Sequence, residues 1–159
     1  LKEDIQNIND LAIDHELRID GNRLMRKDQF IELISNIPLG KIQYFEEPFT
    51  DFSDYQFFLE DYSLSFALDE SFSLFKDKLH KINAALFPFV VLKPTLYGGY
   101  NESLKLIKEL NQLKISVVIS STFEKELGLK CLSQLASYQN TFKETACGLN
   151  TLDFLKISD

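Results

Sequence analysis

The sequence lacks several features that mark particular classes of protein. It has no tryptophan and only two cysteines, Cys131 and Cys147, too few for the disulfide framework of a small secreted domain. Isolated thiols are typical of a reducing compartment, so we expect a cytoplasmic protein. No apolar run approaches the roughly 20 residues of a membrane-spanning helix, and the longest run, residues 87–92, suits a buried strand.

Positive charge is also scarce. Seventeen basic residues against 24 acidic residues give a net charge of −7. Nucleic-acid binders present a basic face, and proteins held at anionic lipid surfaces carry clustered lysine and arginine. The charge balance therefore argues against both classes of partner, and we expect neither a nucleic acid nor a membrane.

What is present is the composition of an ordinary folded domain. The chain has 159 residues, of which 45% are hydrophobic and 26% charged, which excludes an intrinsically disordered tail. No linker or low-complexity stretch divides it, so we predict a single domain over residues 1–159. It begins Leu-Lys-Glu-Asp without methionine, a basic start or an apolar core. We therefore expect it to start within a longer protein, not at a signal peptide.

Short apolar segments alternate with helical patterns along the chain. The segments are residues 17–20, 42–46, 64–69, 87–93, 115–120 and, more weakly, 145–149. Apolar residues at steps of three and four predict helices within residues 1–11, 30–37, 74–82, 104–113 and 127–136. This alternation predicts an α/β fold with about six parallel strands and right-handed crossovers. Since a complete eightfold barrel needs about 250 residues, the chain is either an open sheet or a barrel without its first strands.

Each of the first four apolar segments ends in a charged residue. These residues are Asp20, Glu46, Asp69 and Lys93, at successive separations of 26, 23 and 24 residues. The carboxyl ends of parallel strands are where α/β folds bind ligands. Three converging carboxylates repel one another unless a cation lies between them, and hard oxygen donors suit Mg²⁺. The pattern therefore predicts a magnesium site, although each acid taken alone suits a solvated residue at a loop start.

Other strand-end residues allow two interpretations. Lysine is rarely buried without a partner, so Lys93 is either a functional ammonium or a rim residue. The direction of its pKa stays open, because burial and a cation lower it whereas the acids raise it. Because side chains alternate along a strand, only one of Glu46 and Glu47 can face inward. Candidates for holding a substrate carboxylate, or for simple turn formation, are Asn22, Ser120, Ser121 and the Gly148 backbone.

Six motifs, in order, resemble the enolase superfamily, and within it the o-succinylbenzoate synthases of menaquinone biosynthesis. They read RIDGN, YFEEP, LDES, LKPTLYGGY, VISSTFEKELGL and CGLNTLDFL, and the resemblance runs over residues 17–155. It implies the C-terminal part of a modified (β/α) TIM-like barrel that lacks the N-terminal capping domain and the first barrel strands. The last strand reads ACGLN, where dipeptide epimerases of the superfamily carry an acidic D-x-D segment, and this favours the synthase.

The resemblance also implies roles for single residues. Asp20, Glu46 and Asp69 match the Mg²⁺ ligands, and Lys93 matches a lysine that stabilises the enediolate as a cation. Positions around the substrate carboxylates match Ser120, Ser121, Gly148 and Leu149. The implied reaction is the Mg²⁺-dependent dehydration of 2-succinyl-6-hydroxy-2,4-cyclohexadiene-1-carboxylate to o-succinylbenzoate. The partner is then a small carboxylate substrate.

One element of the family pattern is missing. The family's proton-abstracting lysine lies in a K-x-K motif on the second barrel strand, and no such motif stands at the required place before Asp20. Three alternatives therefore stay open: part of a working synthase, a non-catalytic truncated remnant, or an N-acylamino acid racemase or dipeptide epimerase. A partial barrel leaves strand edges unpaired, so we expect a homo-oligomer or association with the absent N-terminal portion.

Overall fold

The computed structural model describes residues 1–62 and 64–151, without the side chains of Glu60 and Asp61. These residues form two compact units. The first comprises Leu1–Ser73 and Ala85–Phe87, and the second comprises Leu74–Ala84 and the described chain from Pro88 onward. Strands and helices alternate in each unit, so the predicted α/β class is confirmed.

Three short parallel strands organise the first unit: β1 (Leu17–Asp20), β2 (Ile42–Glu46) and β3 (Phe66–Leu68). β2 pairs with both neighbours, and the register places Asp20 opposite Glu46 and Glu46 opposite Ala67. The first two strands have the predicted bounds. The third is shorter than the predicted 64–69, because it begins at Phe66 and ends at Leu68, shortly before the 3-10 turn that starts at Glu70.

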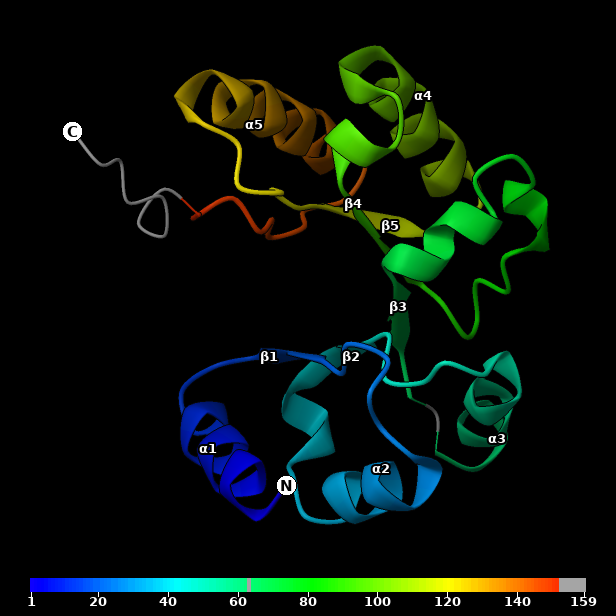
Figure 1. Cartoon of the computed structure of the whole chain (residues 1–159), viewed down its shortest axis with the longest axis vertical. Coiled ribbons are helices and arrows are strands. Elements are labelled where there is room, and N and C mark those ends of the chain that lie inside the picture. Colours follow the sequence, from blue (N-terminus) through cyan, green and yellow to red (C-terminus); the bar gives the residue numbers. More distant parts are fainter. Residues whose placement is uncertain (63, 152–159) are drawn as a thin grey trace. The chain divides into compact units, whose positions relative to one another are not determined.

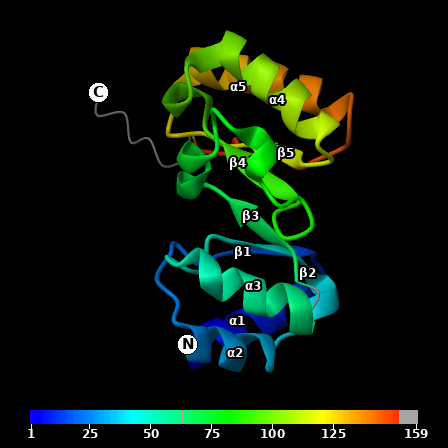
Figure 2. The same cartoon turned by 90° about the vertical axis from the view of Figure 1, so that its right-hand side faces the viewer.

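Helices α1 (Lys2–Ala12), α2 (Lys27–Ile34) and α3 (Phe52–Tyr62) lie on one side of β1 and β2 (Figures 1 and 2). A short 3-10 turn, η1 (Leu39–Lys41), leads into β2. The core between helices and strands is aromatic. The ring of Phe30 meets those of Phe45, Phe49 and Phe58 edge to face, at centroid distances of 4.8, 4.9 and 4.8 Å.

The second unit is built on the parallel pair β4 (Phe89–Leu92) and β5 (Ser116–Ile119). Every residue of both strands is buried, as expected for parallel strands with continuous apolar runs. Helices α4 (Gly99–Gln112) and α5 (Glu126–Asn140) lie side by side against β5 (Figures 1 and 2). Where a sixth strand is predicted at 145–149, the described chain forms a single parallel bridge between Ser120 and Gly148.

The helix predicted within residues 74–82 is wrong. Two 3-10 turns stand in this region, η2 (Glu70–Leu74) and η3 (Leu79–Lys81). Leu74 is 56% exposed whereas Leu79 and Ile82 are buried, so the apolar positions do not share one helical face. A helix forms earlier in the chain instead, at α3 (Phe52–Tyr62), where the sequence analysis predicts none.

No helix among residues 1–62 and 64–151 is long and apolar enough to cross a membrane.

The ends of β1 and β2 approach so closely that only glycine fits at position 21. The Gly21 amide donates to the Glu46 carbonyl at 2.8 Å, and a Cβ added to Gly21 would lie 2.5 Å from the Cα atom of Pro48. Because that atom belongs to the backbone, Gly21→Ala forces the two strand ends apart. We expect a loss of about 1–3 kcal/mol in the free energy of unfolding, measured by urea denaturation.

The matched control is Gly40→Ala. No atom lies within 4 Å of the Cβ position at Gly40, so this variant should unfold at nearly the wild-type urea concentration. Equal stability of the two variants would contradict the close contact at Gly21.

Candidate functional site

The three predicted metal ligands lie at one edge of the first unit. Asp20 and Glu46 are the last residues of β1 and β2 and stand opposite each other in the register. Asp69 directly follows β3. The three strands are parallel neighbours, so all three carboxylates are at carboxyl ends, as the sequence predicts. Asp20 is exposed, Glu46 is half-buried and Asp69 is 4% exposed.

The side chains of these acids are not gathered around a common point. Among the residues that the structure describes, no group of three or more His, Cys, Asp or Glu side chains is placed to hold a metal ion. One oxygen of Asp20 accepts the Asn22 amide at 2.9 Å, which is the local turn expected of aspartate at a loop start. The set of donors fits Mg²⁺ chemically, because all three are hard carboxylate oxygens. Their role as ligands stays a prediction.

Glu47 is a buried carboxylate of the first unit, with 1% of its side chain exposed. Its Oε1 atom accepts the amides of Asp69 at 2.9 Å and Ser71 at 2.8 Å. Its Oε2 atom accepts the Ser71 hydroxyl at 2.9 Å and lies 3.6 Å from Arg23 Nε. Burial raises the pKa of Glu47, and the bonds from Asp69 and Ser71 oppose that rise. Apart from the pair of adjacent acids, no sequence pattern indicates this role.

Lys93 follows β4 in the second unit and is half-buried. Its carbonyl accepts the Leu96 amide at 2.9 Å, which begins the 3-10 turn η4 (Pro94–Leu96). Lys93 thus occupies the predicted strand end. Its catalytic role stays a prediction.

The other predicted substrate-binding residues of the second unit lie together. The Ser120 amide donates to Leu92, the Ser121 amide donates to Gly148, and the Gly148 amide donates to Ile119, at 3.0, 2.9 and 2.9 Å. Leu149 comes next and is half-buried, whereas Asn22 is exposed in the first unit. The end of the CGLNTLDFL motif, residues 152–155, lies outside the described residues. Substrate binding by these residues stays a prediction.

The Glu124 carboxylate accepts hydrogen bonds from several hydroxyl groups, including that of Ser121. No sequence pattern indicates this role. Its Oε2 atom accepts the Ser121 hydroxyl at 2.5 Å and the Thr122 amide at 2.6 Å. Its Oε1 atom accepts the hydroxyls of Thr122 at 2.6 Å and Thr95 at 3.1 Å. The hydroxyl proton of Ser121 is therefore engaged with Glu124, and Thr95 ties the turn after β4 to the turn after β5.

These bonds set the charge of Glu124. Burial raises the pKa of Glu124, but hydrogen bonds from Ser121 and Thr122 outweigh burial and bring the pKa down from 4.5 to about 2. A carboxyl group whose pKa is lower in the folded state stabilises the fold above its unfolded pKa. That contribution is lost as the pH falls from 4.5 to about 2.

Glu124→Gln should remove this part of the acid sensitivity. We expect the stability of the wild type to fall more steeply between pH 4.5 and pH 2 than that of the variant, measured by thermal unfolding across this range. The control is Glu144→Gln at an exposed position, which should keep the wild-type profile. A Glu124→Gln profile parallel to the wild type would contradict the hydrogen-bonding role.

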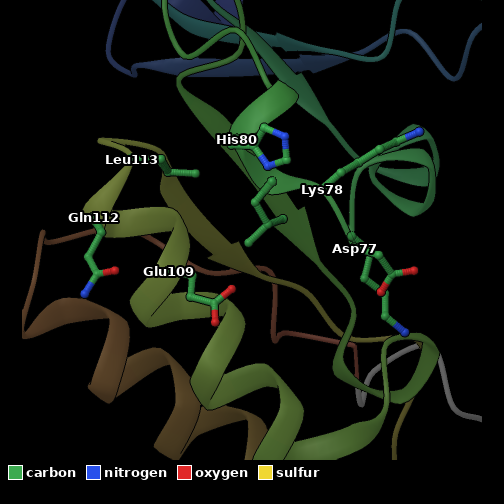
Figure 3. Close-up of a pocket in the computed structure, with 8 residues that line it drawn as sticks. Asp77, Lys78, His80, Glu109, Gln112 and Leu113 are labelled. Carbon is green, nitrogen blue, oxygen red and sulfur yellow. The ribbon is translucent and has the colours of Figure 1, made fainter.

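Each unit contains a cavity. One, of about 390 Å³ in the second unit, is lined by side chains of both charges from residues 76–80 and from the end of α4, including Lys78, His80 and Glu109 (Figure 3). It contains none of the predicted site residues. The other, of about 300 Å³ in the first unit, is lined by Asp4, Asp20 and Asn22 and by apolar residues of α1, β1, α2 and the loop before α2. Asp20 is the predicted metal ligand that lines this hollow.

Comparison with known proteins identifies relatives by sequence, although no family model matches the chain. An o-succinylbenzoate synthase of Aliivibrio fischeri (strain MJ11) is 32% identical over 151 residues, covering 93% of this chain and 45% of the relative. An o-succinylbenzoate synthase of Pectobacterium atrosepticum is 31% identical over 147 residues, covering 90% of this chain and 44% of the relative. The chain spans about half the length of these curated relatives.

Solved structures with the same fold belong to enolase-superfamily proteins. An N-succinyl Arg/Lys racemase of Bacillus cereus aligns with a TM-score of 0.78 and 18% identity, over 98% of this chain and 44% of its own. MenC of Desulfotalea psychrophila aligns with a TM-score of 0.70 and 20% identity, over 93% and 44%. An enolase of Pseudomonas fluorescens with bound magnesium, potassium and tartrate aligns with a TM-score of 0.67 and 19% identity, over 86% and 31%.

These likenesses confirm the predicted barrel portion, because strands and helices alternate here as they do in those proteins. By sequence, the chain is similar to o-succinylbenzoate synthases over about nine-tenths of its own length, and its fold matches part of the barrel of these solved structures.

Proposed function

We propose that this chain carries the metal site and the cationic lysine of an o-succinylbenzoate synthase. The observation that carries the proposal is the 32% identity to such a synthase over 151 residues. The position of Asp20, Glu46 and Asp69 at three adjacent strand ends supports it. The reaction is the dehydration of 2-succinyl-6-hydroxy-2,4-cyclohexadiene-1-carboxylate to o-succinylbenzoate.

The acids of the first unit would hold Mg²⁺, as donors of the kind this ion prefers. Mg²⁺, when bound, would offset the negative charge that develops on a substrate carboxylate as the adjacent proton leaves. An enolase with the same fold has bound magnesium, which agrees with this assignment. The hollow beside Asp20 and Asn22 gives a small carboxylate room at this edge.

Lys93, which follows β4, would supply positive charge. A cation of this kind stabilises an anion that develops on a substrate during a reaction. The proton taken from the ring carbon and the departing hydroxide together leave as water, and the ring becomes aromatic.

Two alternatives differ from the synthase in what they catalyse. The racemase of Bacillus cereus has the same fold with a TM-score of 0.78, and racemisation begins with the same removal of a proton beside a carboxylate. The second alternative is a non-catalytic remnant. The synthase and the racemase differ in the step after proton removal, and the remnant removes no proton, so products distinguish the three functions.

The test is an assay of the purified protein with Mg²⁺ and one of two substrates. The first is the dehydration substrate of the synthase, and the second is an N-succinyl amino acid. Formation of o-succinylbenzoate, followed by chromatography, supports the proposal. Exchange of the α-proton of an N-succinyl amino acid for deuterium, without dehydration, supports the racemase. Absence of both reactions from a folded, Mg²⁺-binding protein overturns catalysis by this chain alone, and Mg²⁺ binding then remains as the supported part of the proposal.

A further inference from the structure

One buried carboxylate, that of Glu47, joins the three chain segments that carry the proposed metal ligands. Glu47 itself follows Glu46. Its Oε1 atom accepts the backbone amide of Asp69 at 2.9 Å. Its Oε2 atom lies 3.6 Å from Nε of Arg23, which is three residues beyond Asp20. A single side chain therefore contacts the turns after β1 and β3 while being attached to the end of β2.

The backbone of Glu47 makes the same connections. Its amide donates to the Ala67 carbonyl at 3.2 Å, and its carbonyl accepts the Arg23 amide at 2.6 Å. The segments after β1, β2 and β3 are therefore fixed to one another at two levels, by backbone ladders and by the carboxylate. A substitution of the Glu47 side chain alters the carboxylate contacts and leaves the backbone hydrogen bonds intact.

The backbone adopts unfavourable conformations where these segments meet. Glu47 has φ +34°, and Asn22 and Arg23 have φ +48° and +58°. Non-glycine residues in this region are strained, and they persist where the surroundings fix them. The left-handed turn also ends the alternation of β2, so the carboxylate of Glu47 reaches across to Asp69 and Ser71.

We propose that Glu47 is a positioning residue that sets the carboxylates of Asp20, Glu46 and Asp69 relative to one another for Mg²⁺ binding. The inference rests on the proposed function, because it assumes that these three acids are the ligands. Groups that orient metal ligands from behind typically contribute 10- to 100-fold in metal affinity. Glu47 accepts a hydrogen bond from the backbone amide of Asp69. This bond fixes the backbone position from which the Asp69 side chain extends.

The variant that tests this role is Glu47→Gln. It keeps the shape of the side chain and one oxygen for the amides of Asp69 and Ser71. It places an amide nitrogen where Oε2 receives the Ser71 hydroxyl and faces Arg23. We expect Mg²⁺ binding to weaken by about 10- to 100-fold. Glu70→Gln is the matched control, because it removes the same charge beside Asp69 from an exposed position, and it should bind Mg²⁺ nearly as the wild type does.

The measurement is calorimetric titration of the full chain with Mg²⁺ alone, with the electron paramagnetic resonance spectrum of bound Mn²⁺ as a second readout. A positioning role changes the spectrum as well as the affinity. If Glu47 served only the fold, Glu47→Gln would bind Mg²⁺ with wild-type affinity and spectrum while melting at a lower temperature, and this result would overturn the inference.

The proposed metal site is tested separately by Asp69→Asn. Wild-type chain that binds no Mg²⁺, or Asp69→Asn that binds as well as the wild type, overturns the metal assignment and the inference with it. Loss of binding in Asp69→Asn but not in Glu47→Gln overturns the inference alone.

A second variant covers the case in which Glu47→Gln does not fold. Ser71→Ala removes one hydrogen bond to Oε2 and leaves both amide bonds to Oε1. It should weaken Mg²⁺ binding by about three- to tenfold. Unchanged affinity in this variant would contradict the inference.

Discussion

Lys93→Ala is expected to lower the kcat of o-succinylbenzoate formation by about 10²- to 10³-fold, the loss typical when one group that stabilises a developing anion is removed. Lys93 is half-buried and directly follows the buried strand β4, and its ammonium would offset negative charge that develops on the substrate. A group that acts in the transition state alone lowers kcat and kcat/KM equally. Steady-state kinetics with the dehydration substrate measure both.

Two further variants serve as controls for Lys93→Ala. Lys93→Arg keeps the positive charge and should recover part of the lost turnover. Lys130→Ala removes a lysine from an exposed position on α5 in the same unit and should leave kcat unchanged. Near-normal turnover of Lys93→Ala would exclude Lys93 from the reaction.

Phe30→Ala is expected to reduce the free energy of unfolding by about 3–5 kcal/mol. Phe30 is fully buried, and its ring meets aromatic rings from β2, from the following loop and from α3. Deleting it leaves a cavity where these elements join. Because domains are stable by only about 5–15 kcal/mol, the loss is a large part of the total.

Urea unfolding followed by circular dichroism measures this loss. Phe123→Ala serves as the control, because Phe123 is 59% exposed, and its stability should stay within about 0.5 kcal/mol of the wild type. Similar midpoints for the two variants would show that the aromatic cluster is not what holds the first unit together.

Strand positions could be predicted from the sequence because apolar runs and the acids that end them are both local signals. β1 and β2 begin and end at the predicted residues. The helix expected within residues 74–82 failed because spacing alone does not distinguish a helical face from successive 3-10 turns. α3 is aromatic at Phe52, Tyr55 and Phe58, at helical spacing, so the same rule applied to aromatic residues indicates this helix.

The sequence predicted which acids stand at strand ends, but it did not predict the hydrogen bonds between side chains of the site. Asp20, Glu46 and Asp69 stand at strand ends, as their spacing indicated. Glu47 and Glu124 were missed because their roles depend on bonds to residues on other segments, such as Ser71 and Thr95. Strand alternation predicts that one of Glu46 and Glu47 faces inward, and Glu47, which has a left-handed backbone, is the more buried of the two.

The left-handed backbone at Arg23 and Glu47 also bears on how this sequence can evolve. Selection for a stable fold alone favours glycine or asparagine where φ is positive, yet both positions carry long charged side chains that face each other at 3.6 Å. Each substitution toward glycine would relieve backbone strain and delete one side of that pair. Homologues that no longer use the strand-end carboxylates are therefore free to acquire glycine at positions 23 and 47. Homologues that keep both charges are expected to be those in which the strand-end carboxylates are still under selection.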